Sequence, residues 1–229
     1  PDGLDWAQMP FRRGLPGAVQ ARDGGAFVAH ADELFARYPI EALELPVPRV
    51  QDAREMAECS WLERLTSLTL AQGAGRTIVA PLLASPLLTR LTELRVGSEM
   101  TTPAAVSTIV STIVRSPVTQ RLTSLAVGRD GARAEGSLAG RLAQLTRPSR
   151  LKKLDLSNNR LTAETVARLV ASPAAESLEE LDLSDNYLGA AGTAAVAGGT
   201  LPNLRALHLR RSRPQEEGVA ALASSPLFR

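Results

Sequence analysis

The sequence predicts an α/β solenoid in which parallel strands alternate with helices along one curved array. The main observation is a six-residue pattern, apolar-x-x-apolar-x-apolar, which occurs seven times and has only aliphatic residues at its 21 apolar positions. Successive patterns begin 25, 26, 31, 29, 27 and 26 residues apart, with helix-forming segments between them. A unit of this length cannot bury its apolar face alone, so the units should stack into a horseshoe with strands on the concave face and helices on the convex face.

Each pattern should form a strand whose apolar side chains enter the core while the other positions point outward. These core positions are, in chain order, Ile40, Leu43, Leu45; Leu65, Leu68, Leu70; Leu91, Leu94, Val96; Leu122, Leu125, Val127; Leu151, Leu154, Leu156; Leu178, Leu181, Leu183; and Leu204, Leu207, Leu209. Residues 40–229 are therefore predicted to form seven repeats.

Residues 1–39 lack the pattern and are predicted to form an N-terminal cap. Six of the eight aromatic residues lie within the first 61 positions. Apolar residues recur at helical spacing from Phe27 to Tyr38, which predicts one amphipathic helix that ends before Pro39. Such a cap would shield the leucines of the first repeat from water.

Ser-Pro pairs are expected to end the helices, because proline cannot continue a helix. These pairs are Ser85-Pro86, Ser116-Pro117, Ser172-Pro173 and Ser225-Pro226. After each of the first three, the next strand pattern begins five residues beyond the proline. The same spacing after Pro226 falls beyond Arg229, so we expect the array to continue past this segment.

The pattern followed by Asn159 or Asn186 resembles leucine-rich repeats of the ribonuclease-inhibitor-like class, in which this asparagine bonds the backbone of adjacent turns. The opening residues Phe11-Arg12-Arg13-Gly14, Phe27, Leu34-Phe35 and Pro39-Ile40 are similar to the start of leucine-rich proteins from planctomycetes and myxobacteria. Many of those bacterial proteins carry a repeat-companion domain upstream. The resemblance implies an interaction module, and it transfers no catalytic residue.

Outward strand positions are the best binding candidates, because they line the concave sheet. In the middle repeats these positions are mostly small and neutral, whereas the last three repeats carry charges of alternating sign. The predicted partner-binding residues are Lys152, Lys153, Asp155, Glu179, Glu180, Asp182, Arg205 and His208. Mixed charge favours a protein partner over a uniformly anionic polymer. A solvated sheet face without a ligand is the alternative.

Other kinds of site have weaker support. Asp155 and Asp182 should lie side by side on neighbouring strands, but repetition of one template explains them better than a catalytic pair. The two histidines, His30 and His208, and the single Cys59 lie in separate regions and share no metal-ligand spacing. We therefore expect no catalytic residue, no metal site and no cofactor.

Composition narrows the possible partners and compartments. The net charge is only +2, and the one basic cluster, from Arg210 to Arg213, lacks interleaved aromatic residues, so nucleic-acid binding is disfavoured. A single cysteine agrees with a reducing cytoplasm, and the sequence has no apolar stretch long enough for a membrane span. The predicted function is a non-enzymatic protein–protein interaction scaffold. The alternative is a regulator of a small GTPase that acts like a GTPase-activating protein.

Overall fold

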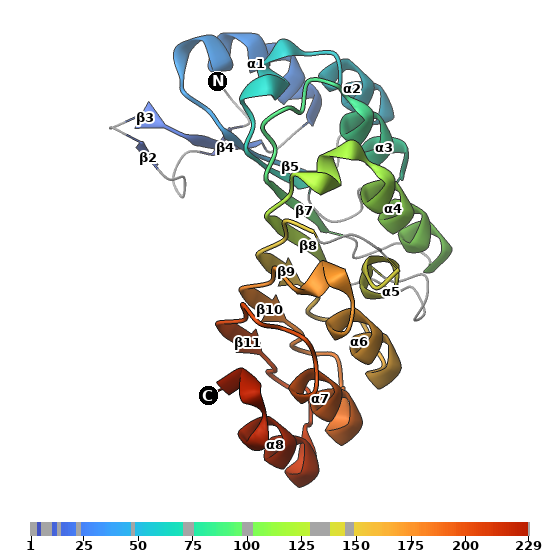
Figure 1. Ribbon diagram of the computed structural model, residues 1–229. Helices are drawn as coiled ribbons and strands as arrows, with labels where there is room; N and C mark the ends of the chain where they lie inside the picture. The colour runs from blue at the N-terminus through green and yellow to red at the C-terminus, as the bar shows by residue number, and fades with distance from the viewer. Residues whose placement is uncertain are drawn as a thin grey trace.

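In the computed structural model, strands line one side of a curved array and helices cover the other side (Figure 1). The structure describes residues 4–5, 11–12, 15–21, 24–46, 49–70, 76–97, 103–128, 138–144 and 149–228. The strands are β1 (Leu4–Asp5), β2 (Phe11–Arg12), β3 (Leu15–Pro16), β4 (Ala18–Ala21), β5 (Ala42–Leu45), β6 (Ser67–Leu70), β7 (Glu93–Gly97), β8 (Ser124–Gly128), β9 (Lys153–Asp155), β10 (Glu180–Asp182) and β11 (Ala206–His208).

The helices follow the strands in alternation and form the convex layer (Figure 1). The α-helices are α1 (Gly24–Arg37), α2 (Val50–Met56), α3 (Arg76–Ala84), α4 (Pro103–Arg115), α5 (Leu138–Leu142), α6 (Ala163–Val170), α7 (Gly189–Ala197) and α8 (Gln215–Ser224). Short 3₁₀ helices are η1 (Ser60–Arg64), η2 (Pro117–Gln120), η4 (Pro173–Ala175) and η5 (Pro226–Phe228).

The main sheet has the order β1-β4-β5-β6-β7-β8-β9-β10-β11, and β4 to β11 are parallel. The predicted α/β leucine-rich solenoid is therefore confirmed, and all seven predicted strands are present. An eighth parallel strand, β4, precedes them and pairs in register with β5. β1 adds an antiparallel edge, while β2 and β3 form a separate hairpin.

The middle apolar residue of each strand lies opposite its counterpart on the next strand, which gives one continuous row through the core. This row is Val19, Leu43, Leu68, Leu94, Leu125, Leu154, Leu181 and Leu207. Leu154 is only 2% exposed, as the pattern predicts. Leu207 is partly buried, because β11 is the last strand of the sheet.

Ser-Pro pairs end four helices as predicted, and the structure adds a function for three of their serines, whereas the Ser172 hydroxyl donates within its own helix, to the Leu169 carbonyl. The Ser85 hydroxyl donates to the carbonyl of Ala57 at 2.6 Å and accepts from the Leu87 backbone N–H at 3.3 Å. Ser116 and Ser225 make the same two kinds of bond, each reaching the preceding repeat. These hydroxyl groups therefore join adjacent repeats, while proline starts a 3₁₀ turn in η2, η4 and η5.

An aromatic cluster connects α1 with the first repeats of the array. The Phe35 ring stacks on Trp61 with centroids 4.7 Å apart, and Phe27 meets Trp61 edge to face at 5.7 Å. Arg64 donates to the backbone carbonyls of Phe35 and Tyr38. These contacts fix α1 (predicted at 26–38, observed from Gly24 to Arg37) against η1, in the connection between β5 and β6.

Candidate functional site

All eight predicted binding residues lie on or directly before β9, β10 and β11, and each is exposed or half-buried. Together they are called here the charged concave surface (Lys152, Lys153, Asp155, Glu179, Glu180, Asp182, Arg205 and His208). The pairing register arranges them in rows across the strands. Lys152, Glu179 and Arg205 form one row, Lys153 and Glu180 belong to the next, and Asp155, Asp182 and His208 form the third.

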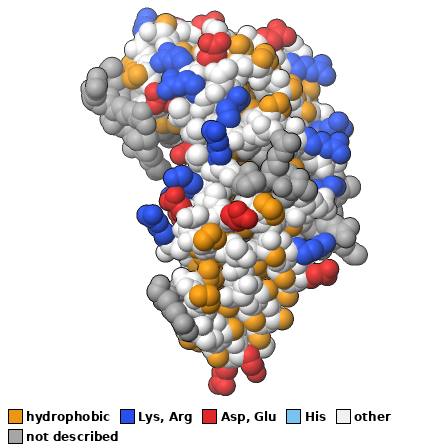
Figure 2. Space-filling view, viewed as in Figure 1, with side chains coloured by type: hydrophobic (Ala, Val, Ile, Leu, Met, Phe, Trp, Pro, Cys, Tyr) orange, Lys and Arg blue, Asp and Glu red, His pale blue; other side chains and the backbone are white. Residues whose placement is uncertain are grey.

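Charges of opposite sign face each other within two of these rows. Lys152 Nζ lies 2.9 Å from Glu179 Oε1, and Lys153 Nζ lies 2.9 Å from Glu180 Oε2. The other oxygen of Glu180 lies 3.5 Å from His208 Nε2. Figure 2 shows basic and acidic side chains next to one another on the strand side, at the left edge of that view.

The ion pairs shift the pKa values of Glu179, Glu180 and Lys153. The hydrogen bond from Lys152 lowers the pKa of Glu179, and the hydrogen bond from Lys153 lowers the pKa of Glu180. The same bond to Glu180 raises the pKa of Lys153. Both glutamates are therefore ionised at neutral pH, so this surface carries charges of both signs.

Asp155 and Asp182 each accept hydrogen bonds from the turn that follows their strand. Asp155 Oδ1 accepts from the Ser157 backbone N–H at 3.0 Å and from its hydroxyl at 2.7 Å. Asp182 Oδ1 accepts from the Ser184 backbone N–H at 2.8 Å. Each aspartate thus combines a turn-forming bond with a half-exposed position on the sheet.

Arg95 belongs to this site, although the sequence placed the site only in the last three repeats. Its guanidinium extends from β7 to Asp155 Oδ2 on β9, 3.4 Å away. The residue between them in register, Ala126 on β8, is small enough to be bridged and is only 5% exposed. The sequence signal that could have indicated this contact is a small residue at the strand position between two residues of opposite charge.

The neutral part of the concave sheet is occupied by a threonine ladder. The hydroxyl groups of Thr66, Thr92 and Thr123 donate to the carbonyls of Glu41, Thr66 and Thr92 at 3.2 to 3.3 Å. Each hydroxyl bonds the preceding strand, so these groups stabilise the sheet. This region carries less charge than the charged concave surface.

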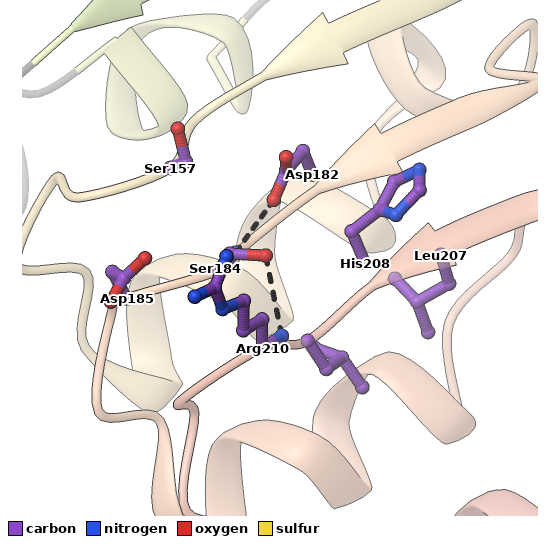
Figure 3. Close-up of a pocket in the computed structure, with 8 residues that line it drawn as sticks. Ser157, Asp182, Ser184, Asp185, Leu207, His208 and Arg210 are labelled. Carbon is purple, nitrogen blue, oxygen red and sulfur yellow. Dashed lines mark hydrogen bonds between the residues drawn. The ribbon is translucent and has the colours of Figure 1, made fainter.

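A pocket of about 460 Å³ lies at the end of the charged concave surface, where β10 and β11 run into their turns. Figure 3 shows Asp182 and His208 on one side, with Ser184 and Arg210 toward the turns. Ser184 Oγ accepts from the Arg210 backbone N–H at 3.2 Å, which ties the two turns together. The pocket is open to solvent and lined mainly by polar residues.

The remaining candidates from the sequence do not combine into a chemical site. His30 is exposed on α1, far along the chain from His208. Desolvation raises the pKa of the Cys59 thiol, which donates to the Glu55 carbonyl, and a neutral thiol is a poor nucleophile. Within the described ranges, no cluster of His, Cys, Asp and Glu is suited to a metal ion. None of the described helices has the length and apolar character needed to cross a membrane.

Comparison with known families matches two segments of the chain. One family model, described as Leucine Rich Repeat, matches residues 150–169, and another, described as Leucine Rich repeat, matches residues 174–197. The comparison with curated proteins finds no match. The matched segments contain β9 and β10 with most or all of the helix that follows each strand. The fold and these motifs define a leucine-rich repeat solenoid, and leucine-rich repeats are in general protein–protein interaction modules.

Proposed function

We propose that this protein is a non-enzymatic scaffold that binds a protein partner through the charged concave surface. The observation that carries the proposal is the in-register arrangement of mixed charges on β9, β10 and β11. Side chains on paired strands lose little freedom when a partner binds, which lowers the entropic cost of association. Alternating charge should contribute mainly to specificity and association rate.

Several finer parts of the sequence interpretation belong to the same proposal. Residues 1–39 would act as the N-terminal cap of a ribonuclease-inhibitor-like array of seven repeats over 40–229, in a bacterial protein. A reducing cytoplasm is the compartment that suits the single Cys59. The chemistry of the described site supports binding rather than catalysis, because both aspartates are engaged by turn backbone.

Site-specific photocrosslinking tests the location of binding. A photoreactive residue would replace Lys152 or Glu179 on the sheet, or Glu164 or Arg168 on α6 as matched helix-face positions. Cells of the organism that encodes the chain would then be irradiated. We expect one protein adduct that forms only from the sheet positions. Adducts formed only from α6, or no adduct from either face, would contradict the proposal. If the crosslinked partner is a small GTPase, faster GTP hydrolysis by that GTPase in the presence of this protein than in its absence would favour the alternative function.

A further inference from the structure

A second exposed surface lies beside the charged concave surface, on the turns that follow β9, β10 and β11. In each turn a buried residue that bonds the neighbouring repeat is flanked by two residues with positive φ. The buried residues are Asn159, Asn186 and Ser212, and the flanking residues are Asn158 and Arg160, Asp185 and Tyr187, and Arg211 and Arg213. Backbone bonds of 2.8 to 3.0 Å join the turns to one another.

Repetition of this turn places Arg160, Tyr187 and Arg213 at equivalent positions in successive repeats. Their φ values are 51°, 49° and 53°. Glycine adopts this left-handed conformation more readily than any residue with a Cβ atom. Each of the three turns therefore carries a large side chain at a position where the backbone geometry favours glycine. All three side chains are exposed to solvent.

Tyr187 is the most exposed large hydrophobic residue among those described, at 66%. The Arg213 guanidinium lies over its ring, 4.9 Å from the centroid. Tyrosine and arginine are the residue types, with tryptophan, that most often dominate binding energy at protein interfaces. An exposed ring already paired with a cation presents a flat, preorganised contact surface.

Charge on this surface is predominantly positive. In the described part of the chain, Arg160, Arg210 and Arg213 form no ion pair with an acidic residue. Arg211 lies 3.3 Å from Asp185, so that pair is neutralised. The adjoining pocket contains Arg210 together with the carboxylates of Asp182 and Asp185 (Figure 3). Those carboxylates would repel a continuous chain of phosphates, whereas a polypeptide can place its charges selectively.

We infer that Arg160, Tyr187, Arg210 and Arg213, called here the Arg–Tyr edge, bind an acidic segment of a protein partner. Carboxylates of that segment pair with the arginines, and an apolar side chain packs on Tyr187. The inference rests on the proposed function, because the adjoining pocket shares Asp182 and His208 with the charged concave surface. It adds the chemistry of the partner and a contact surface outside the sheet.

A short fluorescein-labelled peptide of Glu-Glu-Phe repeats provides a direct probe, with binding followed by fluorescence anisotropy at low salt. The decisive variant is Arg160→Gly/Tyr187→Gly/Arg213→Gly, because glycine accepts positive φ and leaves the turns unstrained. We expect this variant to keep its thermal midpoint and to bind the peptide at least about tenfold more weakly. Arg54→Ala, at an exposed position of α2, is the control and should bind like the unmodified protein.

Three outcomes would overturn the inference: no binding of the acidic peptide, equal binding by the triple variant, or tighter binding of a single-stranded DNA of similar length.

The charge-reversal variant Glu179→Lys/Glu180→Lys separates this inference from the proposed function. Retained peptide binding by that variant, together with loss in the glycine variant, supports the Arg–Tyr edge independently. Loss of the cellular partner only in the charge-reversal variant would support the concave site and show that the edge does not contribute to binding that partner.

Discussion

The guanidinium of Arg95 reaches the carboxylate of Asp155, 3.4 Å away, across a strand on which Ala126 occupies the position between them. The other oxygen of Asp155 accepts two bonds from Ser157. Asp155 therefore belongs to two different structures, a surface ion pair and a strand-ending turn. The two contributions can be separated by changing one partner at a time.

Asp155→Ala should lower the free energy of unfolding by about 1–2 kcal/mol, because the Ser157 N–H and hydroxyl lose their acceptor. Arg95→Ala should change it by less than about 0.5 kcal/mol, since the Arg95 side chain is 61% exposed and its ion pair is screened by water. Urea denaturation of both variants measures the difference. Equal losses would show that the ion pair, rather than the turn, is the stabilising contact.

Leu154→Ala should lower the free energy of unfolding by about 2–5 kcal/mol, since it removes a fully packed side chain and leaves a cavity. Leu207 occupies the same position in the core row but lies on the final strand and is only partly buried. Leu207→Ala should therefore cost less in the same urea titration. A larger loss at Leu207 would contradict the account of the core row.

The Asn186 side chain makes five hydrogen bonds to backbone groups of its own and the preceding turn. Its Oδ1 accepts from the backbone N–H groups of Asn159 and Leu161 at 2.9 and 3.1 Å, and its Nδ2 donates to the carbonyls of Leu156, Leu183 and Ser184. Asn186→Ala would leave several buried backbone groups without partners, and we expect a loss of about 3 kcal/mol.

Asn203→Ala is the control for that change, because Asn203 makes one exposed bond to the Glu176 carbonyl. Thermal and urea denaturation should show little effect of the Asn203 change. If the two asparagine variants are equally stable, the buried ladder does not stabilise the array as described.

The repetitive part of the fold could be predicted from the sequence because each strand pattern encodes its own burial. Leu154, Asn159 and Asn186 lie where the pattern requires, and the outward charges of β9 to β11 reach the surface as expected. Strand β4 was missed because Ala18 and Ala21 flank the single branched residue Val19, so no leucine pattern marks it. Its place in the sheet follows from pairing with β5, which is a tertiary interaction.

The candidate site was predicted only as a set of outward positions, since a pattern does not show which side chains meet. The pairing of Lys153 with Glu180 requires the strand register, and the reach of Arg95 requires the small Ala126 on the strand between. The hydrogen bond from the Ser184 backbone N–H to Asp182 could not be predicted either, because the pattern identifies Asp182 only as an outward charged residue. Tyr187 was not among the predicted binding residues, because its positive φ and its contact with Arg213 are not visible in the sequence.

Acidification should remove a small stabilising contribution of Glu179 and Glu180. Their pKa values are lowered in the folded chain, so the contribution is present above the ordinary glutamate pKa and is lost as pH falls through the folded values. Thermal melts of the unmodified protein and of Glu179→Gln/Glu180→Gln should differ slightly near neutral pH and coincide in strong acid. High salt should shrink the neutral-pH difference. A difference that grows with acid would contradict these ion pairs.

The most direct test of the central claim is the dissociation constant for a partner captured with the unmodified protein, measured against two matched charge reversals. Glu179→Lys/Glu180→Lys changes adjacent glutamates on the charged concave surface, and Glu216→Lys/Glu217→Lys changes adjacent exposed glutamates on α8. The account predicts that the concave reversal weakens binding at least about tenfold while the α8 reversal leaves it unchanged. Unchanged affinity in the concave variant, with loss in the α8 variant, would show that the partner binds the helix face.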